Sequence, residues 1–94
     1  MNSTIKFAKK TLINNRRSNY TLPTNTKLYP AQWNWDSAFI ALGYSNFNLN
    51  YSFKEIKTLI SGQWDDGMIP HILFHIKDLN YTPNYKAWNC GRKI

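Results

Sequence analysis

The feature that most constrains this chain is the run of residues 28–39, which reads Leu-Tyr-Pro-Ala-Gln-Trp-Asn-Trp-Asp-Ser-Ala-Phe. It crowds two tryptophans and a tyrosine around one carboxylate and two amides. Each indole N–H, phenol and carboxylate needs a hydrogen-bonding partner once water is removed, so such a run is costly to bury at random. Flat aromatic faces beside polar tips fit a ligand that is apolar on one face and hydroxylated at its rim, as a sugar ring is.

The same run also marks a change in backbone structure. Pro30 disfavours helix for Tyr29, whereas Asp36 or Ser37 is placed to cap a helix that enters the apolar residues behind it. We therefore expect a helix over residues 36–44. Its apolar residues are almost continuous, and a helix that is apolar most of the way round belongs in the interior of something larger.

Two further helices are predicted. One is capped by Ser3 and runs to about Arg17, with a single narrow apolar stripe that must dock on another element. The other begins with Ser52 and Glu55 in the spacing of a capping box and stops near Gly62. This third helix places Phe53, Ile56, Leu59 and Ile60 on one face and Lys54, Glu55 and Lys57 on the other. No segment has a convincing strand pattern, so the predicted fold class is all-α.

Composition fits one small globular domain. The chain has 94 residues, of which 43% are hydrophobic, 16% aromatic and 18% charged, and its formal net charge is +7. A basic balance raises the possibility of nucleic-acid binding. However, the lysines and arginines gather in the first predicted helix and the last stretch of the chain, whereas the aromatic run carries acids. Solvated helix faces explain this pattern better, and nucleic-acid binding is the weaker alternative.

The compartment is inferred from one cysteine. Cys90 has no partner in the chain for a disulfide, which fits a reducing compartment. The first residues lack the apolar core of a signal peptide, and no segment reaches the length of a membrane span. We expect a cytoplasmic protein with no membrane partner.

A second run, residues 62–74, reads Gly-Gln-Trp-Asp-Asp-Gly-Met-Ile-Pro-His-Ile-Leu-Phe. Together the two runs resemble successive signatures of glycoside hydrolases related to mannosylglycerate and glucosylglycerate hydrolases and to processing α-glucosidase. The resemblance extends from about Leu12 to Trp88. It implies an (α/α)6 barrel, of which residues 1–94 would form the first helices and the N-terminal part. It also implies inverting hydrolysis of a small α-glycoside such as glucosylglycerate or mannosylglycerate.

The resemblance implies that several residues of these runs bind the sugar. For the tryptophans the competing role is core packing, and their i, i+2 spacing sends the two to different sides. For Asp36 it is the helix cap, and for Gln63 a hydrogen bond within its own turn. The predicted substrate-binding residues are Tyr29, Trp33, Trp35, Asp36, Gln63, His71 and Tyr81.

No catalytic residue is expected within the chain. Inverting hydrolysis needs two carboxyl groups about 6.5–9.5 Å apart on opposite sides of the sugar, and the resembled family takes both from later parts of its barrel. The acids here, Asp36, Glu55, Asp65, Asp66 and Asp78, form no persuasive pair. We therefore expect a sugar-binding portion that is inactive alone.

Two histidines raise the question of a metal. His71 and His75 stand four residues apart, but no third ligand has suitable spacing, so we expect neither metal nor cofactor. A self-contained helical module that binds a carbohydrate or a partner protein is the main alternative to the hydrolase reading.

Overall fold

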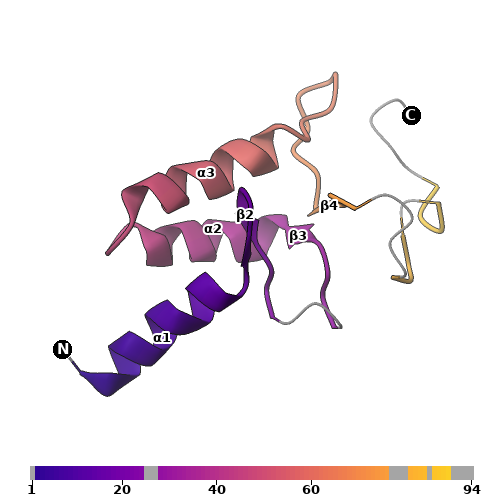
Figure 1. Cartoon of the computed structure of the whole chain (residues 1–94). Helices are drawn as coiled ribbons and strands as arrows, with labels where there is room; N and C mark the ends of the chain where they lie inside the picture. The colour runs from indigo at the N-terminus through magenta and orange to yellow at the C-terminus, as the bar shows by residue number, and fades with distance from the viewer. Residues whose placement is uncertain (1, 25–27, 77–80, 85, 90–94) are drawn as a thin grey trace.

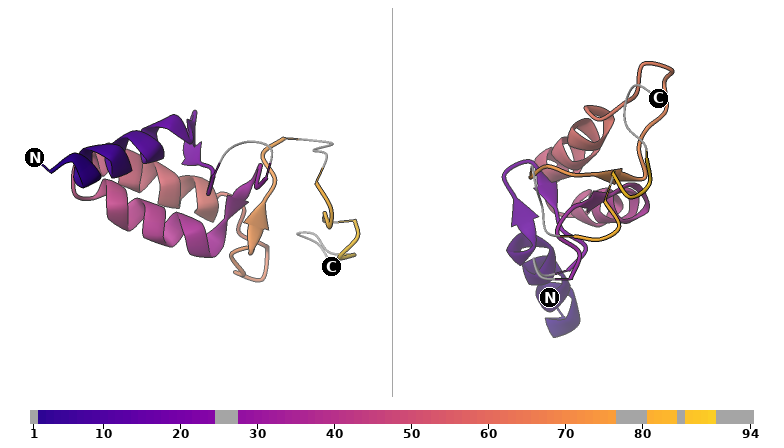
Figure 2. Two further views of the ribbon diagram at one scale, coloured as in Figure 1. Left: turned by 90° about the horizontal axis from the view of Figure 1, so that it is seen from below. Right: turned by 90° about the vertical axis from the view of Figure 1, so that its right-hand side faces the viewer.

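The computed structural model describes residues 2–24, 28–76, 81–84 and 86–89. These contain three helices and four two-residue strands: α1 (Ser3–Asn14), β1 (Arg16–Arg17), β2 (Tyr20–Thr21), β3 (Gln32–Trp33), α2 (Asn34–Tyr44), α3 (Leu49–Ile60) and β4 (Ile72–Leu73). Helices α2 and α3 lie side by side, with α1 against them and β3 and β4 at one end (Figure 1). The described residues that follow β4 lie beyond that end of the helices (Figure 2).

Helix α1 starts one residue before its predicted start and ends before its predicted end. Its cap is Asn2, whose side-chain oxygen accepts from the backbone nitrogen of Thr4 at 2.7 Å, so the predicted Ser3 cap is wrong by one residue. The helix stops at Asn14 rather than Arg17 because Arg16–Arg17 pairs antiparallel with Tyr20–Thr21. Strand pairing outcompetes helix propagation here.

The docking of α1 is narrow. None of its residues is buried. The Tyr44 hydroxyl of α2 donates to the Leu12 carbonyl oxygen at 3.0 Å. A polar contact from α2 thus helps to hold this helix, whose single narrow apolar stripe is predicted to dock on another element.

Helix α2 begins two residues before its predicted start. Trp33 occupies the cap position and makes no side-chain capping bond, so the predicted cap at Asp36 or Ser37 is wrong. Asp36 instead lies in the first turn, where the helix dipole favours a negative charge.

Helix α3 begins before Ser52, so the predicted capping box is also wrong. Asn48 is the cap, and its side-chain oxygen accepts from the backbone nitrogen of Tyr51 at 3.1 Å. Ser52 lies within the helix and donates its hydroxyl to the Ala41 carbonyl oxygen of α2 at 2.7 Å. Glu55, expected on the solvated face, is fully buried.

The face that α3 buries is therefore only partly the predicted apolar one, with Leu59 common to both. Ser52, Glu55 and Leu59 are buried at spacings of three and four, whereas Phe53 and Ile60 are exposed. The polar members of this face find hydrogen-bond partners on α2 and β2, and these partners reduce the cost of burying them.

The all-α class is wrong in one respect, because the described residues include two small antiparallel sheets, β1–β2 and β3–β4. Strands of two residues are too short to give the alternating pattern by which strands are recognised. The β3–β4 pairing also joins segments about forty residues apart, which no local pattern reveals.

The centre of the described structure is largely polar. Its largest fully buried side chains are Tyr44, Gln32, Glu55, Thr21 and Ser37. No helix among the described residues is both long and apolar enough to cross a membrane. Asp78 and Cys90, on which two expectations above depend, lie outside the described residues.

Candidate functional site

The two sequence runs meet at β3 and β4. Trp33 pairs with Ile72 in an antiparallel ladder. Beside it, the backbone nitrogen of Asn34 donates to the His71 carbonyl oxygen at 2.8 Å, and the Asn34 amide donates to the Pro70 carbonyl oxygen at 3.1 Å. The resemblance that links the runs in sequence is thus matched by direct contact in space.

Gly62 allows the second run to pack against the end of α3. A Cβ atom at this position would lie 2.8 Å from Leu73 Cδ1 and 3.1 Å from Pro70 Cγ. The helix itself ends at Ile60 with Ser61 as its cap. Gly62 therefore permits a close approach, in addition to following the helix as predicted.

An aromatic cluster of Tyr29, Trp33, Phe74 and Tyr81 lies at this junction. The Trp33 ring meets Tyr29 at 5.6 Å and Tyr81 at 5.5 Å, both edge to face. Phe74 and Tyr81 are 6.4 Å apart. Edge-to-face contacts hold the rings in fixed relative orientations. Because Tyr29 is 43% exposed and the others are half-buried, the aromatic cluster is a partly open surface rather than a sealed core.

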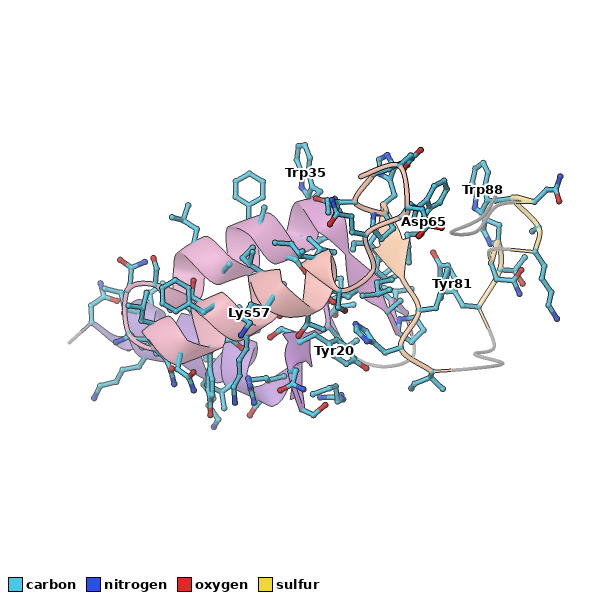
Figure 3. The ribbon with its side chains drawn as sticks, turned by 90° about the horizontal axis from the view of Figure 1, so that it is seen from above. Tyr20, Trp35, Lys57, Asp65, Tyr81 and Trp88 are labelled. Carbon is cyan, nitrogen blue, oxygen red and sulfur yellow. The ribbon has the colours of Figure 1, made fainter. Side chains whose placement is uncertain are left out.

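Trp35 is not part of the aromatic cluster. Its indole is 74% exposed and packs on Phe39, one turn further along α2, at 5.5 Å. It projects from α2 at a distance from Tyr81, which lies beyond β4 (Figure 3). The two tryptophans face different sides, as their spacing predicts.

The other predicted binding residues have different surroundings. Asp36 is half-buried in the first turn of α2, and no side-chain hydrogen bond or ion pair within the described residues engages its carboxylate. His71 is exposed, and its carbonyl oxygen takes part in the β3–β4 junction. Both side chains are therefore accessible to a ligand.

Gln63 belongs to a turn at residues 63–68. Its amide donates to the Gly67 carbonyl oxygen at 2.9 Å, and an Asp66 carboxylate oxygen accepts from the backbone nitrogen of Met68 at 3.0 Å. Gly67 has a φ of 98°, which glycine adopts without strain. Gln63 thus makes the hydrogen bond within its own turn that the sequence offers as its competing role.

A polar network that the sequence analysis missed lies beneath the aromatic cluster. The Gln32 amide nitrogen donates to Ser37 Oγ and to the Glu55 carbonyl oxygen, each at 3.0 Å. Ser37 in turn donates to Glu55 Oε1 at 3.0 Å, and the backbone nitrogen of Thr21 donates to the same oxygen at 3.2 Å. On the other side Gln32 Oε1 lies 2.8 Å from His75 Nε2. We refer to Thr21, Gln32, Ser37, Glu55 and His75 as the polar network.

Burial sets the ionisation of the polar network. Loss of water raises the pKa of Glu55 to about 7, although hydrogen bonds from Ser37 and Thr21 and the charge of Arg16 act against the rise. Burial also lowers the pKa of His75, whose ring stacks on Tyr20 at 3.7 Å. A carboxyl group with this pKa has the acidity of a general acid, but Glu55 is fully enclosed and has no path to a substrate. Its role is structural.

No group of three or more histidine, cysteine, aspartate or glutamate side chains within the described parts of the chain is arranged to hold a metal ion.

Comparison with known proteins identifies the family. Residues 29–93 match the mannosylglycerate hydrolase MGH1-like glycoside hydrolase domain. Mannosylglycerate hydrolase MGH1 of Selaginella moellendorffii is 40% identical over 89 residues, which is 95% of this chain and 18% of that protein. The mannosylglycerate hydrolase of Thermus thermophilus is 43% identical over 82 residues, covering 86% of this chain and 20% of the relative.

Solved structures agree with the sequence match. A GH63 mannosylglycerate hydrolase from Thermus thermophilus, in complex with Tris, superposes with a TM-score of 0.81 at 41% identity over 89% of this chain and 20% of the enzyme. The same enzyme with Tris and D-glycerate gives a TM-score of 0.76 over 83% of this chain and 19% of the enzyme. The chain thus spans about a fifth of the length of these relatives. Since the family match covers most of its residues, the chain belongs to the MGH1-like glycoside hydrolase domain family.

Proposed function

We propose that this chain provides the sugar-binding N-terminal portion of an inverting glycoside hydrolase that acts on a small α-glycoside such as mannosylglycerate or glucosylglycerate. In this proposal residues 1–94 form the first helices of a single (α/α)6 domain in the cytoplasm. The aromatic cluster supplies apolar walls, and Asp36 accepts hydrogen bonds from sugar hydroxyls. Trp35, Gln63 and His71 are the remaining predicted contacts.

The observation that carries the proposal is the meeting of the two runs at β3 and β4. It joins Tyr29, Trp33 and Tyr81 into a partly exposed aromatic surface. Asp36, in the first turn of the helix that follows Trp33, has no side-chain partner among the described residues. Aromatic faces beside a few unpaired polar groups are what a sugar site requires. The relatives are mannosylglycerate and glucosylglycerate hydrolases, and the Thermus enzyme has been solved with D-glycerate and with glucose.

Catalysis needs carboxyl groups beyond those that the described residues offer. Asp65 and Asp66 are exposed in a turn, and Glu55 is enclosed in the polar network. Asp36, in the first turn of α2, is the one remaining acid among the described residues. One carboxylate cannot both protonate the leaving group and activate water from the opposite face. The chain by itself is expected to bind the glycoside without hydrolysing it.

Calorimetric titration of the chain with mannosylglycerate and glucosylglycerate tests this function. We expect saturable binding of at least one of them, weakened about tenfold or more by Asp36→Ala, because that change removes a charged hydrogen-bond acceptor. Asp65→Ala is the matched control, since Asp65 is an exposed acid of the turn. Wild-type affinity in Asp36→Ala would leave Asp36 with a role in the helix terminus only.

The same titrations separate the alternatives. Oligonucleotide binding that falls steeply between two salt concentrations, without sugar binding, would replace the proposal with the nucleic-acid reading that the net charge of +7 raises. The absence of any sugar binding would likewise contradict it.

A further inference from the structure

The amide of Gln32 has a defined partner at each of its hydrogen-bonding positions. The Glu55 carbonyl oxygen can only accept, so the Gln32 atom that faces it must be the amide nitrogen. Gln32 Oε1 then faces His75, which must present its Nε2 as an N–H donor. Because burial lowers the pKa of His75, this histidine is neutral and its proton resides on Nε2.

The donors of the polar network consequently run in one direction. His75 donates to Gln32, Gln32 donates to Ser37, and Ser37 donates to Glu55 Oε1. Gln32 and Ser37 each accept one of these bonds and donate the next, so each bond polarises its neighbour and the whole set has one arrangement. Gln32 and Ser37 are completely buried, which makes a broken member costly.

The first bond of this directed chain, from His75 to Gln32, joins residues that adjoin the aromatic cluster in sequence. Gln32 immediately precedes Trp33 in β3, and His75 immediately follows Phe74 after β4. Since β4 ends at Leu73, no ladder hydrogen bond fixes residues 74 and 75. The hydrogen bond between the Gln32 and His75 side chains instead ties this segment to β3, and the His75 ring also stacks on Tyr20.

We propose that Gln32 and His75 are positioning residues that hold Trp33 and Phe74 in the arrangement of the aromatic cluster. The proposal rests on the proposed function, because it assigns the polar network the task of shaping the sugar-binding wall. Neither residue touches the sugar in this scheme. Their bond fixes the segment after β4, so that Phe74 meets Tyr81 and Tyr81 meets the Trp33 edge.

The test compares two substitutions of His75 and measures their effect on the NMR signals of the tryptophan indole N–H groups. His75→Gln and His75→Asn both replace the ring by an amide and lose the stack on Tyr20. Only glutamine places an N–H donor as far from the backbone as histidine Nε2. In ¹⁵N-labelled full chain, Trp33 and Trp35 give separate indole N–H signals, which Trp→Phe substitutions assign. Trp35 is the internal reference because it packs on Phe39, away from the aromatic cluster.

We expect His75→Asn to displace the Trp33 signal and to weaken mannosylglycerate binding about tenfold, and His75→Gln to restore both, with Trp35 unchanged throughout. An unmoved Trp33 signal in His75→Asn, or equal displacement in both variants, would overturn the proposal. If His75→Asn unfolds, so that its indole signals collapse to those of an unfolded chain, His75→Phe decides, since it keeps a ring on Tyr20 and removes only the donor. A displaced Trp33 signal in His75→Phe then supports the proposal, and an unmoved one overturns it. The Trp33 signal is measured without sugar, so failure of the positioning role is distinguishable from failure of sugar binding.

Discussion

The carboxyl group of Glu55 is buried at the centre of the described structure, and only one of its two oxygens accepts hydrogen bonds. Its Oε1 accepts from Ser37 and Thr21, whereas Oε2 and the buried Arg16 Nη2 have no hydrogen-bond partner among the described residues. The Arg16 charge lowers the pKa of Glu55, but desolvation is the larger effect. The guanidinium is itself held over the Tyr51 ring at 3.7 Å. Burial therefore favours the neutral acid.

The raised pKa predicts how Glu55 affects stability. The folded chain holds the Glu55 proton up to about pH 7, whereas the unfolded chain releases it near 4.5, so folding takes up a proton between these values. The contribution of Glu55 to the unfolding free energy is therefore largest below pH 4.5 and is lost as pH rises to about 7. The rise in pKa is equivalent to about 3 kcal/mol.

The unfolding free energy of Glu55→Gln should accordingly increase relative to that of the wild type as pH rises. Urea unfolding at pH 5 and pH 8 measures the difference between the two proteins, which we expect to shift in favour of glutamine by about 2–3 kcal/mol. Only this difference is informative, because the lowered pKa of His75 makes the stability of both proteins rise with pH. Asp65→Asn, an exposed acid, should show no such shift, and a constant Glu55→Gln difference across the range would contradict an enclosed carboxyl.

At the level of elements, the start of α3 distinguishes an Asn48 cap from the predicted capping box of Ser52 and Glu55. The structure assigns the cap to Asn48, whose side chain accepts from the Tyr51 backbone nitrogen. Asn48→Ala should lower the unfolding free energy by about 1 kcal/mol, since it leaves a helix N–H without its partner. Asn50→Ala is the matched control: this residue is exposed within the helix, where alanine is slightly favoured. Urea unfolding that shows equal effects would contradict the Asn48 cap.

The comparison of α3 with its sequence shows what local pattern can and cannot predict. The helix itself follows from its apolar spacing, but Ser52 and Glu55 match a capping box that does not form. These two residues lie on the buried face of α3. Their hydrogen-bond partners are Ala41, Ser37 and Thr21, which come from other segments of the chain. A buried polar face differs from a solvated one only through such distant contacts.

The candidate site divides in the same way. The sequence resemblance brings Tyr29, Trp33 and Tyr81 together, and their rings are in contact. It assigns no role to Phe74 and His75, because their positions depend on a strand pairing and a side-chain bond that join segments about forty residues apart. Trp33 and Trp35 are separated because Trp33 ends β3 whereas Trp35 lies in the first turn of α2, where residues two positions apart do not share a face.

At the scale of the whole molecule, the structure is elongated, and its helices leave several large apolar side chains exposed. The molecule measures 48 × 28 × 18 Å, and its radius of gyration of 14.2 Å exceeds the roughly 12 Å typical of a compact domain of this length. Along α2, Trp35, Phe39 and Leu42 are 74%, 61% and 65% exposed at spacings of four and three. On α3 Phe53 is 59% exposed. The apolar run that predicts an interior position for α2 is thus left open on one side.

An apolar helix face of this kind should bind a hydrophobic dye. We expect the chain to enhance the fluorescence of anilinonaphthalene sulfonate, and the double substitution Phe39→Gln with Leu42→Gln to reduce that enhancement severalfold while the far-ultraviolet circular dichroism stays the same. The helix survives because both side chains point to solvent, and glutamine is a good helix former. Ala38→Gln is the control, since it adds the same polar group to an exposed position without removing a large apolar side chain. Equal dye binding by the double variant and the wild type would mean that the dye reads a loosened interior instead, and the open face of α2 would then not be the apolar surface that the exposed fractions describe.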